Sequence, residues 1–128
     1  MPDQVVLDSS AILALLRVEP GGQGVASVLD VALLSTVNMT EVHTRLLRLG
    51  EAPVTAWKQI SRLECEICPF TQEQARIAAE LIQVTQPYGL SLGDRACLAL
   101  AIDRQGKVYT TDRAWKNLSL GIEIEVIR

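Results

Sequence analysis

The feature that most constrains the fold is a regular alternation of short strand-like runs with helical patterns, joined by short connectors. Apolar and β-branched runs predict five strands, at residues 4–7, 31–37, 66–70, 107–110 and 123–127. The helical pattern before the fourth run carries no polar residue from Ala96 to Ile102, so this helix should be buried nearly all round. Alternating strands and helices predict an α/β domain whose central parallel sheet is flanked by helices.

Capping residues predict where several helices begin. Asn38 is expected to cap a helix that runs to Leu49, and Thr71 opens a capping box with Gln74 on a helix to about residue 83. Pro53, which is favoured in a first helical turn, begins another helix. Further helices are expected at residues 9–17, 23–29 and 113–117.

Length and composition set limits on domain count and cellular setting. A chain of 128 residues is predicted to form one domain over residues 1–128, and its 48% apolar content indicates a packed core. No apolar stretch is long enough to span a bilayer. The first residues lack the basic head and cleavage site of a signal peptide, so a cytoplasmic location without membrane association is expected.

The three cysteines and the single histidine argue against several chemistries. Cys65 and Cys68 form a C-x-x-C pair, but they lie where a predicted helix passes into a strand, whereas a redox pair normally opens a helix. With no second cysteine pair, a zinc site is not supported. The only histidine, His43, is two residues from Glu41 and should point away from that acid, toward a surface or interface.

Four carboxylates lie where helices are expected to begin. Asp8 follows the first predicted strand and Asp112 follows the fourth. Glu41 comes just after the second strand, and Asp94 opens the apolar helix. The carboxyl ends of parallel strands meet at one edge of a sheet, which is where open α/β sheets bind ligands. Several acids gathered there would repel one another unless a cation lay between them, so the pattern predicts a divalent-metal site.

Each acid also has a purely structural explanation. Asp is among the best N-cap residues, which would account for Asp8 and Asp112. The pairs Asn38–Glu41 and Ser91–Asp94 each have the spacing of a capping box. Capping explains acids at helix starts one at a time, but it does not explain why acids also follow the first and fourth strands. The joint pattern therefore favours a site.

The net charge of −3 does not exclude a nucleic-acid substrate. Setting aside the four candidate acids leaves 12 basic and 11 acidic residues, and a bound divalent ion would add positive charge where a phosphate would lie. Equally, the chain has no broad basic patch of the kind that a binding-only module uses.

The motifs, taken in order, resemble a known family. The segments Val5–Ala11, Asn38–Val42, Ser91–Ala96 and Tyr109–Trp115 are similar to those of the PIN domain, and more closely to the VapC type of toxin nuclease from toxin–antitoxin pairs. The resemblance implies a PIN-like three-layer fold with a central parallel sheet of about five strands. It also implies a Mg²⁺- or Mn²⁺-dependent endoribonuclease that acts on RNA, binds a small cognate antitoxin and forms a homodimer.

The same resemblance identifies the acidic site and its polar supports, namely Asp8, Glu41, Asp94 and Asp112 with Ser10 and Thr110. Asp8, Asp94 and Asp112 are expected to ligate the metal, because carboxylate oxygens suit hard Mg²⁺ or Mn²⁺. Glu41 is expected to act as a ligand or as a base. The hydroxyls of Ser10 and Thr110 would orient carboxylates or water.

Further contacts are predicted for two arginines and three apolar residues. Arg95 and Arg113 adjoin site acids and are expected to contact substrate phosphates, with a solvated surface position as the alternative. Self-association is expected through an apolar helix face that carries Val42, Leu46 and Leu49.

Two other functional classes are consistent with parts of the pattern. A metal-dependent phosphatase with an aspartyl nucleophile would also have an Asp after its first strand, but the haloacid-dehalogenase type has a second acid where Ser10 stands. A non-catalytic PIN-like regulatory or interaction domain would use the acids only as caps. Cleavage of RNA, hydrolysis of a small phosphate ester, or inactivity on both would separate the three.

Overall fold

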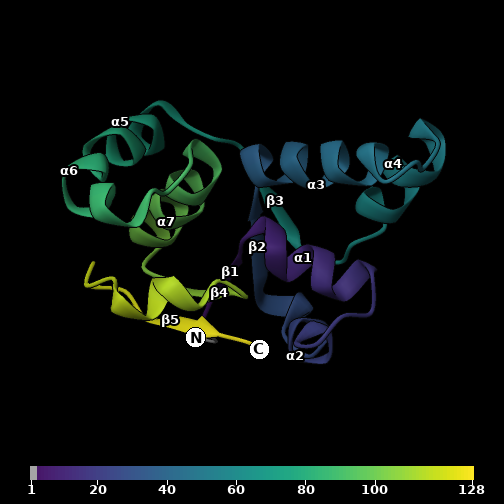
Figure 1. The fold of residues 1–128 in the computed structure, drawn as a ribbon, viewed down its shortest axis with the longest axis horizontal. Helices are drawn as coiled ribbons and strands as arrows, with labels where there is room; N and C mark the ends of the chain where they lie inside the picture. Colours follow the sequence, from purple (N-terminus) through teal and green to yellow (C-terminus); the bar gives the residue numbers. More distant parts are fainter. Residues whose placement is uncertain (1–2) are drawn as a thin grey trace.

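The computed structural model describes residues 3–128, and its strands form one parallel five-stranded sheet (Figure 1). The strands are β1 (Val5–Leu7), β2 (Ala32–Ser35), β3 (Glu66–Cys68), β4 (Lys107–Thr110) and β5 (Ile124–Val126). The α-helices are α1 (Ser9–Leu16), α2 (Gly22–Ala26), α3 (Thr36–Arg48), α4 (Pro53–Ser61), α5 (Gln72–Glu80), α6 (Ile82–Thr85) and α7 (Leu92–Arg104). Short 3-10 helices are η1 (Leu29–Val31), η2 (Gln86–Tyr88) and η3 (Arg113–Asn117). The predicted α/β fold is confirmed.

The strand order places β1 at the centre of the sheet. The order is β3-β2-β1-β4-β5, so the chain first builds outward from β1 to β3 and then adds β4 and β5 on the other side. Val5 of β1 pairs with Ala32 of β2, and Leu7 pairs with Tyr109 of β4. In open α/β sheets, ligands bind beyond the carboxyl ends of the strands at such a reversal of direction. Here the reversal lies between β1 and β4.

Helices cover both faces of the sheet, which gives three layers (Figure 1). Val5 and Leu7 pack toward α1–α4, whereas Val6 packs toward α5 and α7 on the opposite face. Because successive side chains of a strand point to opposite faces, a strand covered on both sides must be apolar throughout. Helix α7 is buried from Ala96 to Ala101, as its apolar sequence predicted.

The start of α3 differs from the prediction. The Ser35 hydroxyl accepts the backbone N–H of Val37 at 3.2 Å, so α3 begins at Thr36 and its N-cap is Ser35 rather than Asn38. Asn38 instead lies buried inside the first turn. Serine caps a helix about as well as asparagine, so local pattern could not decide between two good caps three residues apart.

The C-x-x-C pair is divided between the two cores. Cys65 packs on the α1–α4 side of the sheet, while Cys68 packs on the α5–α7 side, and all three cysteine thiols are free. Burial raises the pKa of the Cys68 thiol to about 11, with the negative charge of Glu66 adding to the effect. The thiol is therefore protonated near neutral pH, and the pair is not arranged for redox chemistry.

The surface predicted for self-association is wrong at two of its three residues. Val42 and Leu46 are 0% exposed and belong to the core, whereas Leu49 is 41% exposed. Their spacing of four residues marks the face of α3 that packs on the sheet, not a face left for a partner.

Across residues 3–128, every helix is too short or too polar to cross a membrane.

Candidate active site

Asp8 lies at the carboxyl end of the central strand and is 5% exposed. Its carboxylate accepts the Ser10 hydroxyl at 2.6 Å, the Thr110 hydroxyl at 2.5 Å and the backbone N–H of Ala11 at 2.8 Å. Burial raises the pKa of Asp8 to about 6, against the lowering effect of these hydrogen bonds. A carboxyl group with so perturbed a pKa in a pocket is a candidate functional group.

Ser10 and Thr110 link Asp8 to the end of β4. The Ser10 hydroxyl donates to Asp8 and accepts the backbone N–H of Thr111 at 3.0 Å. The Thr110 hydroxyl donates to Asp8 and accepts the backbone N–H of Asp112 at 3.1 Å. Each hydroxyl thus uses its single proton on Asp8, which fixes the orientation of the carboxylate between β1 and β4.

Glu41 approaches the same space from α3. Its Oε1 accepts the Ser9 hydroxyl at 2.5 Å and the side-chain amide of Asn38 at 2.9 Å. The alternative explanation of Glu41 by a capping box with Asn38 is therefore excluded, because both residues lie within α3 and meet through their side chains. The buried Asn38 amide also donates to the carbonyl of Gly93 at 3.1 Å, which joins α3 to α7.

Gly93 permits the close approach of α7 to α3. A Cβ atom at this position would overlap the carboxylate of Glu41. The first turn of α7 therefore lies directly against Glu41. Sequence reasoning did not identify Ser9, Asn38 or Gly93 as part of the site. The available signal was a glycine in the first turn of an otherwise strong helix, directly before a candidate acid.

Asp94 forms the predicted capping box with Ser91. The Ser91 hydroxyl accepts the backbone N–H of Asp94 at 3.1 Å, and the Asp94 carboxylate accepts the backbone N–H of Ser91 at 2.9 Å. Burial is the main cause that raises the pKa of Asp94, and the negative charges of Glu41 and Asp112 raise it further, against the hydrogen bonds from Ser91. Asp94 in turn contributes to the raised pKa of Asp8. The acids thus form one interacting set.

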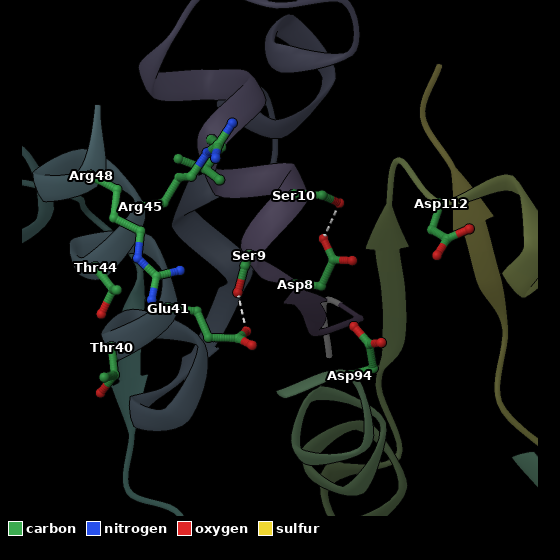
Figure 2. A pocket seen from close by; sticks show the side chains of 11 residues that line it. Asp8, Ser9, Ser10, Thr40, Glu41, Thr44, Arg45, Arg48, Asp94 and Asp112 are labelled. Carbon is green, nitrogen blue, oxygen red and sulfur yellow. Dashed lines mark hydrogen bonds between the residues drawn. The ribbon is translucent and has the colours of Figure 1, made fainter. Parts of the chain in front are cut away.

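All four acids line a single pocket of about 480 Å³ beyond the ends of β1 and β4. Figure 2 shows their carboxylates around a common space, although they come from four different parts of the fold. The other lining residues are Ser9, Ser10, Leu13, Thr40, Thr44, Arg45 and Arg48. The pocket therefore contains every carboxylate that the sequence pattern selected.

Three of the acids are caps as well as pocket residues. Asp8 is the N-cap of α1, Asp94 completes the capping box that Ser91 begins on α7, and Asp112 accepts the backbone N–H of Ala114 at 3.0 Å at the start of η3. Each helix needs its own cap, but capping does not require that caps of three elements share a pocket with Glu41. Capping positions the carboxylates, and their shared pocket makes joint chemistry available.

The two arginines predicted to contact phosphates lie outside this pocket lining. Arg95 donates to the backbone carbonyl of Ala78 on α5 at 2.8 Å, and its contact with a phosphate stays a prediction. Arg113 is exposed in η3. Neighbouring residues on a helix point in different directions, so adjacency to an acid in sequence does not by itself place a side chain in the pocket. His43 lies away from the pocket, with its ring 5.4 Å from that of Trp57.

The pocket offers the donors that a hard divalent cation prefers, namely carboxylate oxygens from four side chains. As placed, no three His, Cys, Asp or Glu side chains within residues 3–128 lie close enough together to hold one ion. Mutual repulsion opposes a closer approach of carboxylates until a cation offsets it. The donor set thus fits Mg²⁺ or Mn²⁺ in chemistry, and binding would draw the side chains together.

Comparison with known proteins agrees with this architecture. A family model described as "PIN domain" matches residues 5–120. A comparison with curated protein sequences found no significant match. Among solved structures, DNA-bound VapBC from Salmonella typhimurium is 15% identical, with 97% of this chain and 98% of that chain covered and a TM-score of 0.76.

Two structures from Mycobacterium tuberculosis are also similar. VapC20, described as a sarcin-ricin loop cleaving toxin, is 17% identical, with 94% of this chain and 99% of that chain covered and a TM-score of 0.74. VapBC-5, a member of the VapBC family of toxin–antitoxin systems, is 25% identical, with 99% of each chain covered and a TM-score of 0.65. Since the family model spans most of its length, this chain belongs to the PIN domain family.

Proposed function

We propose that this protein is a Mg²⁺- or Mn²⁺-dependent endoribonuclease and the toxin of a toxin–antitoxin pair. The observation that carries the proposal is the gathering of four carboxylates from separate elements around one pocket at the edge of the sheet. Membership of the PIN family supports nuclease activity. The description of the structurally similar VapC20 as a toxin that cleaves the sarcin-ricin loop supports RNA as the substrate class.

The proposed roles follow from the contacts of each acid. Asp8, Asp94 and Asp112 would hold the metal, and Glu41 would be a further ligand or would accept a proton from the attacking water. Ser10 and Thr110 hold the Asp8 carboxylate in one orientation. A bound Mg²⁺ or Mn²⁺ would supply Lewis-acid polarisation of the phosphate.

We also propose that a small antitoxin covers the pocket and that the protein self-associates. Four acids in one pocket attract a cation, so an Arg or Lys of the antitoxin would be held there by charge-assisted hydrogen bonds. The description of VapBC-5 as a member of the VapBC family of toxin–antitoxin systems supports a partner of this kind. A light-scattering mass equal to the monomer at high concentration would remove the homodimer from the proposal.

Metal-dependent RNA cleavage is the direct test. The purified protein should cut RNA in Mg²⁺ or Mn²⁺ and stop in EDTA. Undiminished cleavage in excess chelator would contradict the metal site. Expression in cells without an antitoxin should arrest growth. If the protein cleaves RNA in vitro but its expression leaves growth unaltered, the toxin role is contradicted and the nuclease activity is not.

One observation favours an inactive interaction domain as the alternative: three of the four acids take part in helix capping, Asp8 and Asp112 as N-caps and Asp94 in the capping box of Ser91. A phosphatase with an aspartyl nucleophile is less well supported, since the position two residues after Asp8 holds Ser10, which hydrogen-bonds to Asp8. Hydrolysis of a small phosphate ester without RNA cleavage would indicate the phosphatase. Inactivity on both substrates would indicate the interaction domain.

A further inference from the structure

The pocket continues past the acids along α3, where its lining becomes basic. Thr40, Thr44 and Arg48 lie on successive turns of α3, and Arg45 lies one turn beyond Glu41 (Figure 2). All of these side chains line the pocket that contains the four acids. One helix therefore presents a carboxylate near its middle and two guanidinium groups in its last turn.

The size of the pocket leaves room for more than a metal ion. Arg48 comes seven residues after Glu41, which corresponds to about 10 Å along the helix axis. The volume of about 480 Å³ falls within the range that accommodates organic ligands. The basic end of the pocket is thus separated from the acids by enough space for a second charged group of the same ligand.

The helix dipole alone does not account for this arrangement. Arg45 and Arg48 lie in the last turns of α3, where a cation is favoured by the carbonyl ends of the helix. That effect requires only a basic residue at the helix end, not side chains that line the acidic pocket. Within residues 3–128, neither arginine forms an ion pair, whereas Arg17, Arg76 and Arg104 each pair with a glutamate.

We propose that Arg45 and Arg48 bind the backbone phosphate next to the one that is cleaved, with the Thr44 hydroxyl as a neutral contact. The proposal rests on the proposed nuclease function, and it makes the substrate a polynucleotide strand rather than an isolated phosphodiester. A phosphate that flanks the reacting one would otherwise meet only the negative charge of the acids. Guanidinium groups offset that repulsion and match phosphate oxygens with paired hydrogen bonds.

Single-charge variants test the proposal by binding. Arg45→Gln and Arg48→Gln are made in an Asp8→Asn parent, and Arg62→Gln is the matched control. Arg62 is exposed at the C-terminus of α4 and does not line the pocket. It therefore has the charge and the helix-end position of Arg45 and Arg48 without their place in the pocket. Gln keeps a good helix propensity and much of the side-chain length. The probe is a fluorescein-labelled single-stranded RNA of mixed sequence, measured by anisotropy in EDTA over a range of salt.

Each pocket variant should weaken RNA binding about tenfold, the loss expected for one charge-assisted contact. The slope of log affinity against log salt should fall by about 0.7 for each lost phosphate contact, and Arg62→Gln should change neither quantity. If the parent binds no RNA, or if all three variants bind as the parent does, the proposal is overturned.

Cleavage by the otherwise wild-type protein separates this proposal from the nuclease assignment. With Mg²⁺ or Mn²⁺, Arg45→Gln and Arg48→Gln should raise KM for RNA with little change in kcat, because a flanking contact is lost equally from bound substrate and transition state. Hydrolysis of bis(p-nitrophenyl) phosphate, which has no flanking phosphate, should be unchanged. Normal KM for RNA in both variants would remove the arginine contact and keep the nuclease. RNA binding that depends on the arginines, by a protein that cuts neither substrate, would keep the arginine contact and remove the nuclease assignment.

Discussion

Asp8 is a carboxyl group buried at the centre of the sheet edge, with hydroxyl and amide donors as its hydrogen-bond partners. These neutral donors offset only part of the free energy lost when the ionised group leaves water, so its pKa stays near 6. The same residue caps α1. At the residue scale, therefore, one side chain stabilises the fold as a hydrogen-bond acceptor and destabilises it as a charge.

The stability of the metal-free protein should fall as the pH rises from about 4 to about 6. The folded-state pKa of Asp8 is raised to about 6 from 3.8, so the folded state binds more protons in this range. The stabilising contribution of protonated Asp8 to the free energy of unfolding is fully present below the unfolded-state pKa and is lost once the pH exceeds the folded-state pKa. The effect is about 3 kcal/mol. Urea titrations in EDTA should show this decline in the wild type. A parallel decline of the same size in Asp8→Asn would assign it to other groups.

Neutral isosteres should separate capping from charge. Asn caps as well as Asp, and Gln accepts the same hydrogen bonds as Glu, so Asp8→Asn, Glu41→Gln, Asp94→Asn and Asp112→Asn keep the structural role. Each should raise the melting temperature in EDTA by removing a negative charge from the acidic pocket, with the largest rise at Asp8, where the burial of the charge is the main cost. Each should also lose RNA cleavage and the stabilisation that Mg²⁺ or Mn²⁺ gives, most severely at Asp8 and Asp94. Wild-type cleavage by both Asp8→Asn and Asp94→Asn would end the metal-site proposal.

At the scale of elements, the site depends on the contact between α3 and α7. Asn38 crosses this contact, with its amide on Glu41 and on the carbonyl of Gly93. Gly93 has no side chain, which leaves the space that the Glu41 carboxylate occupies. The helix start at Ser35 places both Asn38 and Glu41 on the side of α3 that faces α7. Adding a single methyl group at this contact should therefore affect RNA cleavage.

Gly93→Ala should reduce RNA cleavage, because the new methyl group takes the space that the Glu41 carboxylate occupies. The carboxylate is the end of a flexible side chain and can move aside, and Ala favours a helix over Gly, so the free energy of unfolding should change by less than about 1 kcal/mol. Gly24→Ala in α2 is the matched control. Apart from the adjacent residues and the backbone of α2 itself, no atom of the described residues lies within 4 Å of a Cβ built on Gly24, so this change should stabilise by about 0.5–1 kcal/mol. Denaturant unfolding and cleavage rates of the two variants decide the point. Full activity in Gly93→Ala would show that the position of Glu41 does not matter.

At the scale of the whole molecule, the sheet is covered on both faces, and neighbouring residues of a strand belong to separate cores. Leu33 packs toward α5 and α7, while Leu34 packs toward α1–α4. Both faces therefore contribute to stability, and the site lies at the edge where the two helical layers and the sheet end together.

Leu33→Ala and Leu34→Ala should each destabilise the fold by about 2–5 kcal/mol, because each leaves a cavity in a different core. Leu92→Ala is the control, since Leu92 is 55% exposed in the first turn of α7. Chemical denaturation measures all three. A small effect from either strand residue would mean that one face of the sheet is open to solvent, contrary to a three-layer fold.

The sequence by itself determined the elements and the acids, because these depend on local patterns. Residues 107–110 were predicted as a strand and form β4 with the same bounds, and Ser91 and Asp94 form the predicted capping box. Periodicity and capping concern residues within one turn of each other, so a single segment contains the information.

Only the tertiary structure decided which side chains meet at the pocket. The strand order brings Thr110 against Asp8 across 102 residues, and the packing of α7 on α3 brings Gly93 against Glu41. The arginines illustrate the reason. Arg95 was chosen for its adjacency to an acid, yet it points to α5, whereas Arg45 lies one turn beyond an acid and shares its pocket. Helical spacing gives candidates for a shared face, but the packing of the whole chain determines what that face contacts.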